Sequence, residues 1–152
     1  MPIATPKGDR RCQPAPLPLP RPCALRLALL GDAAASGATG LLLATAAGPL
    51  APLLELPTPL LRDAGLVLLP YAAFVAWAGT RDRPPRWAVR AAIIINLLWA
   101  ADGALLLAVG PIAPSEFGFA FVLAQALVVL GFAIAQWSAL RRWRADVTPV
   151  LA

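Results

Sequence analysis

Long apolar stretches alternate with short polar or proline-containing connections along most of this chain. Four stretches are long enough for a helix that crosses a bilayer, and they cover about residues 25–48, 60–79, 87–109 and 117–140. Such a helix needs roughly 20 mostly apolar residues at about 1.5 Å rise each. The pattern therefore predicts an all-α protein, an integral membrane four-helix bundle that covers residues 25–144.

The segments outside the four spans differ in composition. Seven prolines fall within residues 1–24, a density that excludes helix and sheet, so we expect a proline-rich, disordered tail there. Residues 145–152 form a short C-terminal tail. The connection between the first two spans is rich in both proline and leucine, so we expect it to lie in the outer interface with one short helical turn at 51–56. Pro70 predicts a kink within the second span.

Positive charge is concentrated in alternate connections. Basic residues precede the first span, separate the second from the third and follow the fourth, whereas the other connections carry Arg62 and otherwise only Glu55, Asp63 and Glu116. Arginine and lysine stay on the cytoplasmic side of a membrane protein. We therefore expect a multi-pass protein of the cell inner (plasma) membrane with both the N-terminus and the C-terminus in the cytoplasm. Three tryptophans near the cytoplasmic ends are predicted interface anchors, namely Trp87, Trp137 and Trp143.

Composition supports the bilayer as the principal partner. The chain is 59% hydrophobic and only 14% charged, which leaves too little polar surface to cover a globule in water. The basic residues that give the chain its net charge of +5 flank the apolar spans. They therefore indicate membrane topology and attraction to anionic lipid, and not nucleic-acid binding.

The residue types needed for common catalytic and metal sites are largely missing. Histidine is absent, and the only cysteines, Cys12 and Cys23, are too far apart for a CxxC redox pair or a zinc site. We expect no catalytic residues, no cofactor and no metal, and so a protein that is not an enzyme.

Polar side chains within the spans form the candidate site. Counting inward from the cytoplasmic arginines puts a first level at roughly 8–9 Å, made of Asp32, Asn96 and Gln136. A second level at roughly 15–18 Å contains Ser36, Tyr71 and Asp102, with Gln125 a little higher and Trp99 on the same helical stripe as Asn96. These residues predict a polar column along the bundle axis. Asp102 lies about 120° from Asn96 around the helix, so both face one interior only if the third span is mostly buried.

Four interpretations of these polar residues are open. They are hydrogen-bond glue between helices at around 0.6 kcal/mol per bond, protonatable groups in a substrate or ion path, side chains that face lipid, or residues in a stretch wrongly assigned as a span. An aspartate at a span centre costs about 2.5–3.5 kcal/mol on the insertion scale, so Asp32 and Asp102 are the residues that need an explanation.

The first span is rich in small residues. Ala33 with Gly37, and Ser36 with Gly40, give small-xxx-small pairs that allow helices to approach closely. We expect this span to be the packed centre of the bundle. A homo-oligomer or a membrane-protein partner through Gly31, Gly37 and Gly40 is a further expectation.

The chain resembles a family of small four-helix bacterial integral membrane proteins of unknown function. The matching residues lie within about 25–144; they are Asp32 with Ser36-Gly37, Gly48-Pro49-Leu50-Ala51 leading to Leu54, Leu56 and Pro57, Arg62 with Gly65, Asn96, Leu98-Trp99, Asp102, Ala120 to Ala126, and Gln136 before Arg141-Arg142. The resemblance implies a four-helix fold and no particular activity.

Two further families are similar more loosely. Asp32 in the first span is similar in position to the carboxylate of small multidrug-resistance transporters, which implies proton-coupled drug export. The stretches Arg83-Pro84-Pro85-Arg86-Trp87 and Asn96-Leu97-Leu98-Trp99 resemble tryptophan-rich sensory proteins, which implies porphyrin or sterol binding. The leading hypothesis is a structural or accessory membrane protein. The alternative is proton-coupled small-molecule transport or small-ligand binding that uses Asp32 or Asp102.

Overall fold

The protein is a bundle of four helices, seen here in a computed structural model that describes residues 21–109 and 114–145. The helices are α1 (Arg21–Leu54), α2 (Thr58–Thr80), α3 (Arg86–Val109) and α4 (Glu116–Ala145). The described residues contain no strand. Each helix is long and apolar enough to cross a membrane, so the predicted all-α membrane bundle is confirmed. Most of the predicted tails, at residues 1–20 and 146–152, lie outside the described residues. Residues 21–24, expected in the disordered tail, instead form the first turn of α1, where Pro22 is tolerated because its missing N–H would have no partner within the helix.

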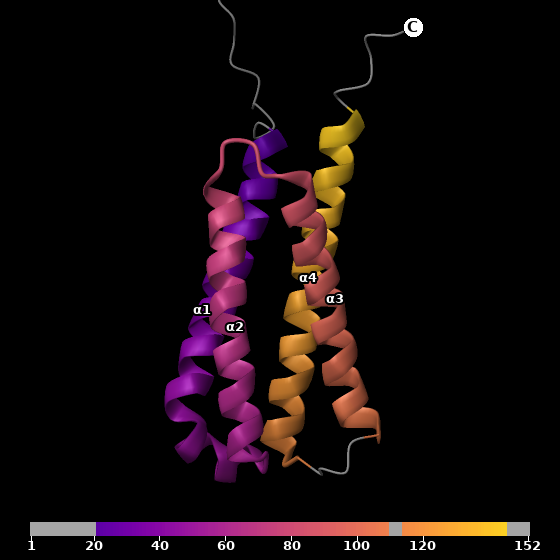
Figure 1. Cartoon of the computed structure of the whole chain (residues 1–152). Coiled ribbons are helices and arrows are strands. Elements are labelled where there is room, and N and C mark those ends of the chain that lie inside the picture. Colours follow the sequence, from indigo (N-terminus) through magenta and orange to yellow (C-terminus); the bar gives the residue numbers. More distant parts are fainter. Residues whose placement is uncertain (1–20, 110–113, 146–152) are drawn as a thin grey trace, which may run out of the picture.

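The four helices pair as two antiparallel hairpins, α1 with α2 and α3 with α4 (Figure 1). The most extensive contact is between α1 and α2, while α1 also packs on α4, and α2 contacts α3 only slightly. The start of α1, the α2–α3 connection and the end of α4 lie at one end of the bundle (Figure 1). We call this the arginine end, because Arg26, Arg81, Arg83 and Arg141 lie near it. The α1–α2 and α3–α4 connections lie at the opposite end.

Helix α1 extends past the boundary that its sequence predicts. It continues to Leu54, with a kink at Ala46, whose φ of −111° and ψ of 18° leave the helical region. Pro49 explains the kink, since a proline ring clashes with the carbonyl four residues earlier. The expected turn at 51–56 is thus the end of this helix, and Glu55 ends it with a φ of 52°. Helix α2, in contrast, continues through Pro70 to Thr80.

Two glycines set the close approach of α1 and α2. A Cβ atom built on Gly65 would lie 2.5 Å from the backbone nitrogen of Ala44 and 2.8 Å from the carbonyl oxygen of Gly40. Backbones that approach this closely gain dispersion contacts, which matter because lipid removes the hydrophobic drive for helices to associate. Gly37 faces Ala72 of α2 at ordinary contact distance. The small-residue stripe of α1 therefore packs against α2, and a partner chain through it stays a prediction.

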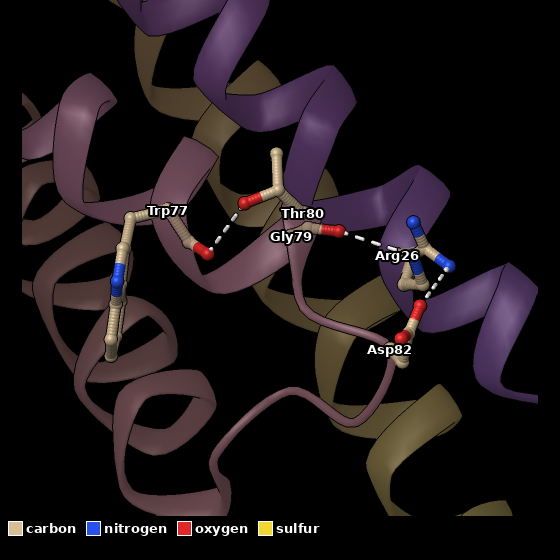
Figure 2. Close-up of polar contacts among 5 residues, drawn as sticks. All are labelled: Arg26, Trp77, Gly79, Thr80 and Asp82. Carbon is tan, nitrogen blue, oxygen red and sulfur yellow. Dashed lines mark hydrogen bonds and ion pairs between the residues drawn. The ribbon is translucent and has the colours of Figure 1, made fainter.

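A polar contact aligns α1 with α2 at the arginine end. The Nε of Arg26 donates to the carbonyl oxygen of Gly79 at 3.2 Å, and its Nη1 lies 3.6 Å from a carboxylate oxygen of Asp82 (Figure 2). At the same C-terminal end of α2, the hydroxyl of Thr80 donates to the carbonyl oxygen of Trp77 (Figure 2). The contacts of Arg26 tie the first turns of α1 to the end of α2, where a Cβ on Gly79 would lie 3.2 Å from Cβ of Leu29.

Ser115 joins the C-terminal end of α1 to the N-terminal end of α4, at the end of the bundle away from the arginines. Its hydroxyl donates to the carbonyl of Leu53 at 2.8 Å and accepts from the backbone N–H of Gly118 at 3.1 Å, the bond of a helix N-cap. Its backbone N–H donates to the carbonyl of Leu54 at 3.2 Å. One residue thus satisfies groups at the end of α1 and the start of α4, where neither helix can satisfy them alone.

We predict that Gly65→Ala destabilises the bundle by about 1–3 kcal/mol, because its methyl group would overlap the backbone of α1. Gly131→Ala is the matched control, since a Cβ at Gly131 meets no atom within 4 Å. The measurement is the free energy of unfolding in mixed micelles titrated with a denaturing detergent. Equal stabilities of the two variants would contradict the close approach of α1 and α2.

Candidate polar site in the membrane

A single carboxylate, that of Asp32 on α1, receives hydrogen bonds from all four helices. Asp32 is fully buried, with 0% of its surface exposed. Within the described residues, four side chains donate to it, namely Ser36 of α1, Tyr71 of α2, Asn96 of α3 and Gln136 of α4. We call these five residues the Asp32 cluster.

The two carboxylate oxygens of Asp32 share these donors unequally. Oδ2 accepts from the hydroxyl of Tyr71 at 2.9 Å, from Nδ2 of Asn96 at 2.8 Å and from Nε2 of Gln136 at 2.7 Å. Oδ1 accepts from the hydroxyl of Ser36, one turn further along α1, at 3.1 Å. A carboxylate offers about four acceptor sites. The cluster therefore leaves Asp32 little capacity to bind anything else.

The cluster contains more acceptor atoms than hydrogens to fill them. The hydroxyl of Tyr71 has one hydrogen, yet Oδ1 of Asn96 lies 3.0 Å away and the carbonyl of Ala92 3.5 Å away, in addition to Asp32. The Oε1 atom of Gln136 is buried and has no partner among the described residues. The cluster can therefore accept one more hydrogen bond, for example from a water molecule, or take up a proton.

The structure brings together the three residues of the first predicted level, but it does not bring together those of the second. Asp32, Asn96 and Gln136 meet at one height, as the count from the arginines predicts. Ser36 and Tyr71 were expected a level deeper, with Asp102, but both bond to Asp32. Two physical reasons explain the correction.

The first reason concerns Ser36, whose side chain points back toward the N-terminus of α1 and so reaches Asp32, one turn before it. The second reason is that rise per residue places a Cα atom, whereas hydroxyl groups lie at the ends of side chains that reach along the axis. A depth count therefore misplaces a long side chain more readily than a short one.

Asp102 does not belong to the Asp32 cluster. It lies six residues beyond Asn96 on α3, is exposed where Asn96 is buried, and forms no hydrogen bond or ion pair in the part of the chain described. The expected single column of polar groups is therefore wrong for this residue. The cause is that the second half of α3 is not enclosed by its neighbours, because every buried residue of α3 lies between Ala88 and Asn96.

Asp102 lines a pocket between the two helical hairpins. The pocket has a volume of about 110 Å³, and each of the four helices contributes to its wall. Its polar lining residues include Asp102, Trp99, Gln125 and Thr39, of which Gln125 donates from Nε2 to the hydroxyl of Thr39 at 3.3 Å. The remaining wall is mostly leucine. We call this the Asp102 pocket.

Among the polar residues of this pocket, Thr39 is the one that the sequence did not predict. It lies seven residues after Asp32 and three after Ser36, which places all three on one helical stripe. A threonine near a span centre attracts little notice because its hydroxyl is often satisfied by its own helix. Its bond to α4 appears only when the helices are assembled.

Two further hollows, one of about 350 Å³ and one of about 20 Å³, lie between the Asp102 pocket and the Asp32 cluster and share lining residues with them. A second hollow, between α1 and α4, shares Thr39, Gln125 and Leu68 with the Asp102 pocket and reaches Ser36. A third, of about 20 Å³, lies between α2 and α3 and is lined by Tyr71 and Asn96. The two polar regions are therefore neighbours, separated by apolar side chains such as Leu68.

The described residues contain no group of three or more His, Cys, Asp or Glu side chains that could hold a metal ion. Comparison with family models, curated proteins and solved structures finds no match for the chain. The site is consequently interpreted from its own geometry.

We predict that Tyr71→Phe and Asn96→Ala are not additive in their effects on the free energy of unfolding, because the two side chains bond each other and share Asp32. Each single change is expected to cost about 0.6–1.7 kcal/mol. Tyr71→Phe with Thr39→Val is the control pair, since Thr39 bonds Gln125 and shares no partner with Tyr71. Additivity in both pairs would argue against the shared network.

Proposed function

We propose that this chain is a non-enzymatic, multi-pass protein of the bacterial inner membrane with a structural or accessory role. The observation that carries the proposal is the Asp32 cluster, in which one buried carboxylate joins all four helices. A side chain whose acceptor sites are occupied by its own protein is suited to fixing a fold. It is less suited to capturing a substrate.

The direction of these bonds supports a structural use of Asp32. An unpartnered buried carboxylate is expensive in lipid, so each donor both lowers that cost and fixes the position of its helix. Arg26, the nearest basic residue on α1, is directed instead to Gly79 and Asp82. Asp32 is thus stabilised by hydrogen bonds from neutral groups, and removing it leaves four donors without their acceptor.

We predict that Asp32→Leu lowers the free energy of unfolding by about 2–3 kcal/mol, the sum of four bonds of about 0.6 kcal/mol each. Asp32→Asn should retain most of the stability, because its amide oxygen can still face the donors of α2, α3 and α4. Asp102→Leu is the control and should cost little, since Asp102 is exposed. If Asp32→Asn kept full stability yet abolished a pH-dependent uptake that the parent shows, the alternative of proton-coupled transport would replace the structural role.

We also propose that the arginine end of the bundle faces the cytoplasm. Both described chain ends and the α2–α3 connection lie there (Figure 1), together with most of the basic residues. Cation–π contacts place Arg81 4.8 Å from the ring of Trp77 and Arg141 5.6 Å from the ring of Trp137. Tryptophan beside arginine suits the boundary between acyl chains and headgroups.

In a variant without Cys12 and Cys23, we expect a cysteine at position 116 to react with a membrane-impermeant thiol reagent added to intact cells. Glu116 is exposed and lies at the end away from the arginines. The matched cysteine at position 82, where the Asp82 side chain is fully exposed, should react only after the cells are opened. The reverse labelling pattern would overturn the proposed orientation.

A second candidate function is the binding of a small ligand at the Asp102 pocket. The specific observation in its favour is that Asp102 lines a pocket without a described protein partner, whereas Asp32 is enclosed by donors. Of the two intramembrane aspartates, Asp102 is therefore the one placed to contact a ligand.

A further inference from the structure

We propose that the Asp102 pocket binds a small organic ammonium cation that carries one apolar group of about the size of a benzene ring. The proposal rests on the second candidate function above and gives that function a ligand class. Three properties of the pocket determine the class: its charge, the nature of its walls and its size.

The charge of the pocket comes from Asp102. Counted from Arg90, Asp102 lies roughly 18 Å along α3, and from Val109 it lies roughly 10 Å, so it is within the apolar part of the span. Arg62, the basic residue of the facing half of α2, is not among the residues that line the pocket. A carboxylate at this depth gains most from a partner of opposite charge, because lipid screens charges poorly.

The walls of the pocket suit an amphipathic cation. Trp99 and Asp102 are three residues apart on α3 and therefore neighbours on one face, so an ammonium group at the carboxylate would also lie near the indole ring. Oxygen atoms of Gln125 and Thr39 can accept further N–H bonds from the opposite side. Beyond these polar groups, Leu61, Leu68, Leu106 and Phe121 offer an apolar surface for the rest of the ligand.

The size of the pocket limits the apolar group. Its volume of about 110 Å³ is close to that of an apolar protein cavity of roughly 150 Å³ that accommodates benzene. The weak contact between α2 and α3, and the exposed second half of α3, leave a lateral route from the bilayer. An anion would be repelled by Asp102, and a neutral molecule would leave its carboxylate unpaired. A small cation that partitions into lipid meets all three conditions.

The test is isothermal titration of the full chain in lipid nanodiscs with phenethylammonium, and with neutral 2-phenylethanol as a probe of the same shape. Empty nanodiscs correct for partition into lipid. We expect phenethylammonium to bind the parent, and Asp102→Asn to weaken that binding about tenfold or more, as expected for loss of a charged partner. The matched control is Asp63→Asn, which removes an exposed carboxylate that does not line the pocket, and it should leave the affinity unchanged.

A pocket-filling variant separates the ligand class from the pocket itself. A Cβ on Gly103 would lie 3.5 Å from Cγ1 of Val122, an ordinary contact, so Gly103→Leu should fold and occupy the pocket. If both probes bind equally, Asp102→Asn has no effect and Gly103→Leu abolishes binding, the pocket binds ligands but the cation class is overturned. If neither probe binds above empty nanodiscs, both the class and the second candidate function fail. Equal losses in Asp102→Asn and Asp63→Asn would also overturn the proposal, since they indicate a general charge effect.

Discussion

The buried carboxylate of Asp32 is the constraint on which the arrangement of the four helices depends. A charged or polar side chain within the bilayer must find partners inside the protein, because lipid supplies none. Asp32 finds one donor on each helix, and those donors are effective only at one height and one rotation of each helix. The apolar surfaces cannot impose such specificity, since leucine packs against lipid about as well as against another leucine.

The bundle is packed unevenly along its length. Near the arginine end, Arg26 of α1 bonds Gly79 of α2, and all the buried residues of α3 lie in its first half. Further out, the second half of α3 contains no buried residue, and the Asp102 pocket lies there between the two hairpins. One aspartate thus lies where packing is complete and the other where it is not. Asp32 is therefore enclosed by donors, whereas Asp102 is accessible.

Much of the fold could be predicted from local patterns. Apolar length and the alternation of arginines give four helices and their common end, and the structure places α2 and α3 within two residues of the predicted bounds. Helix α1 was predicted too short because Pro49 and Pro52 look like the end of a helix in sequence, whereas the kink at Ala46 accommodates them. The depth count placed Asp32, Asn96 and Gln136 together because all three are measured from arginines at matching heights. It failed for Tyr71 because a count of Cα atoms does not describe how far a long side chain reaches along the axis.

The sequence by itself determined that the chain forms four apolar helices and which polar side chains each helix brings into the membrane. These are local properties, fixed by hydrophobic length and by the cost of placing charge in lipid. Only the tertiary structure decided which of those side chains meet, that Ser36 and Tyr71 complete the Asp32 cluster, and that Asp102 faces a pocket. The rotation and tilt of a helix depend on its contacts with other helices, because lipid presents the same apolar surroundings to every face.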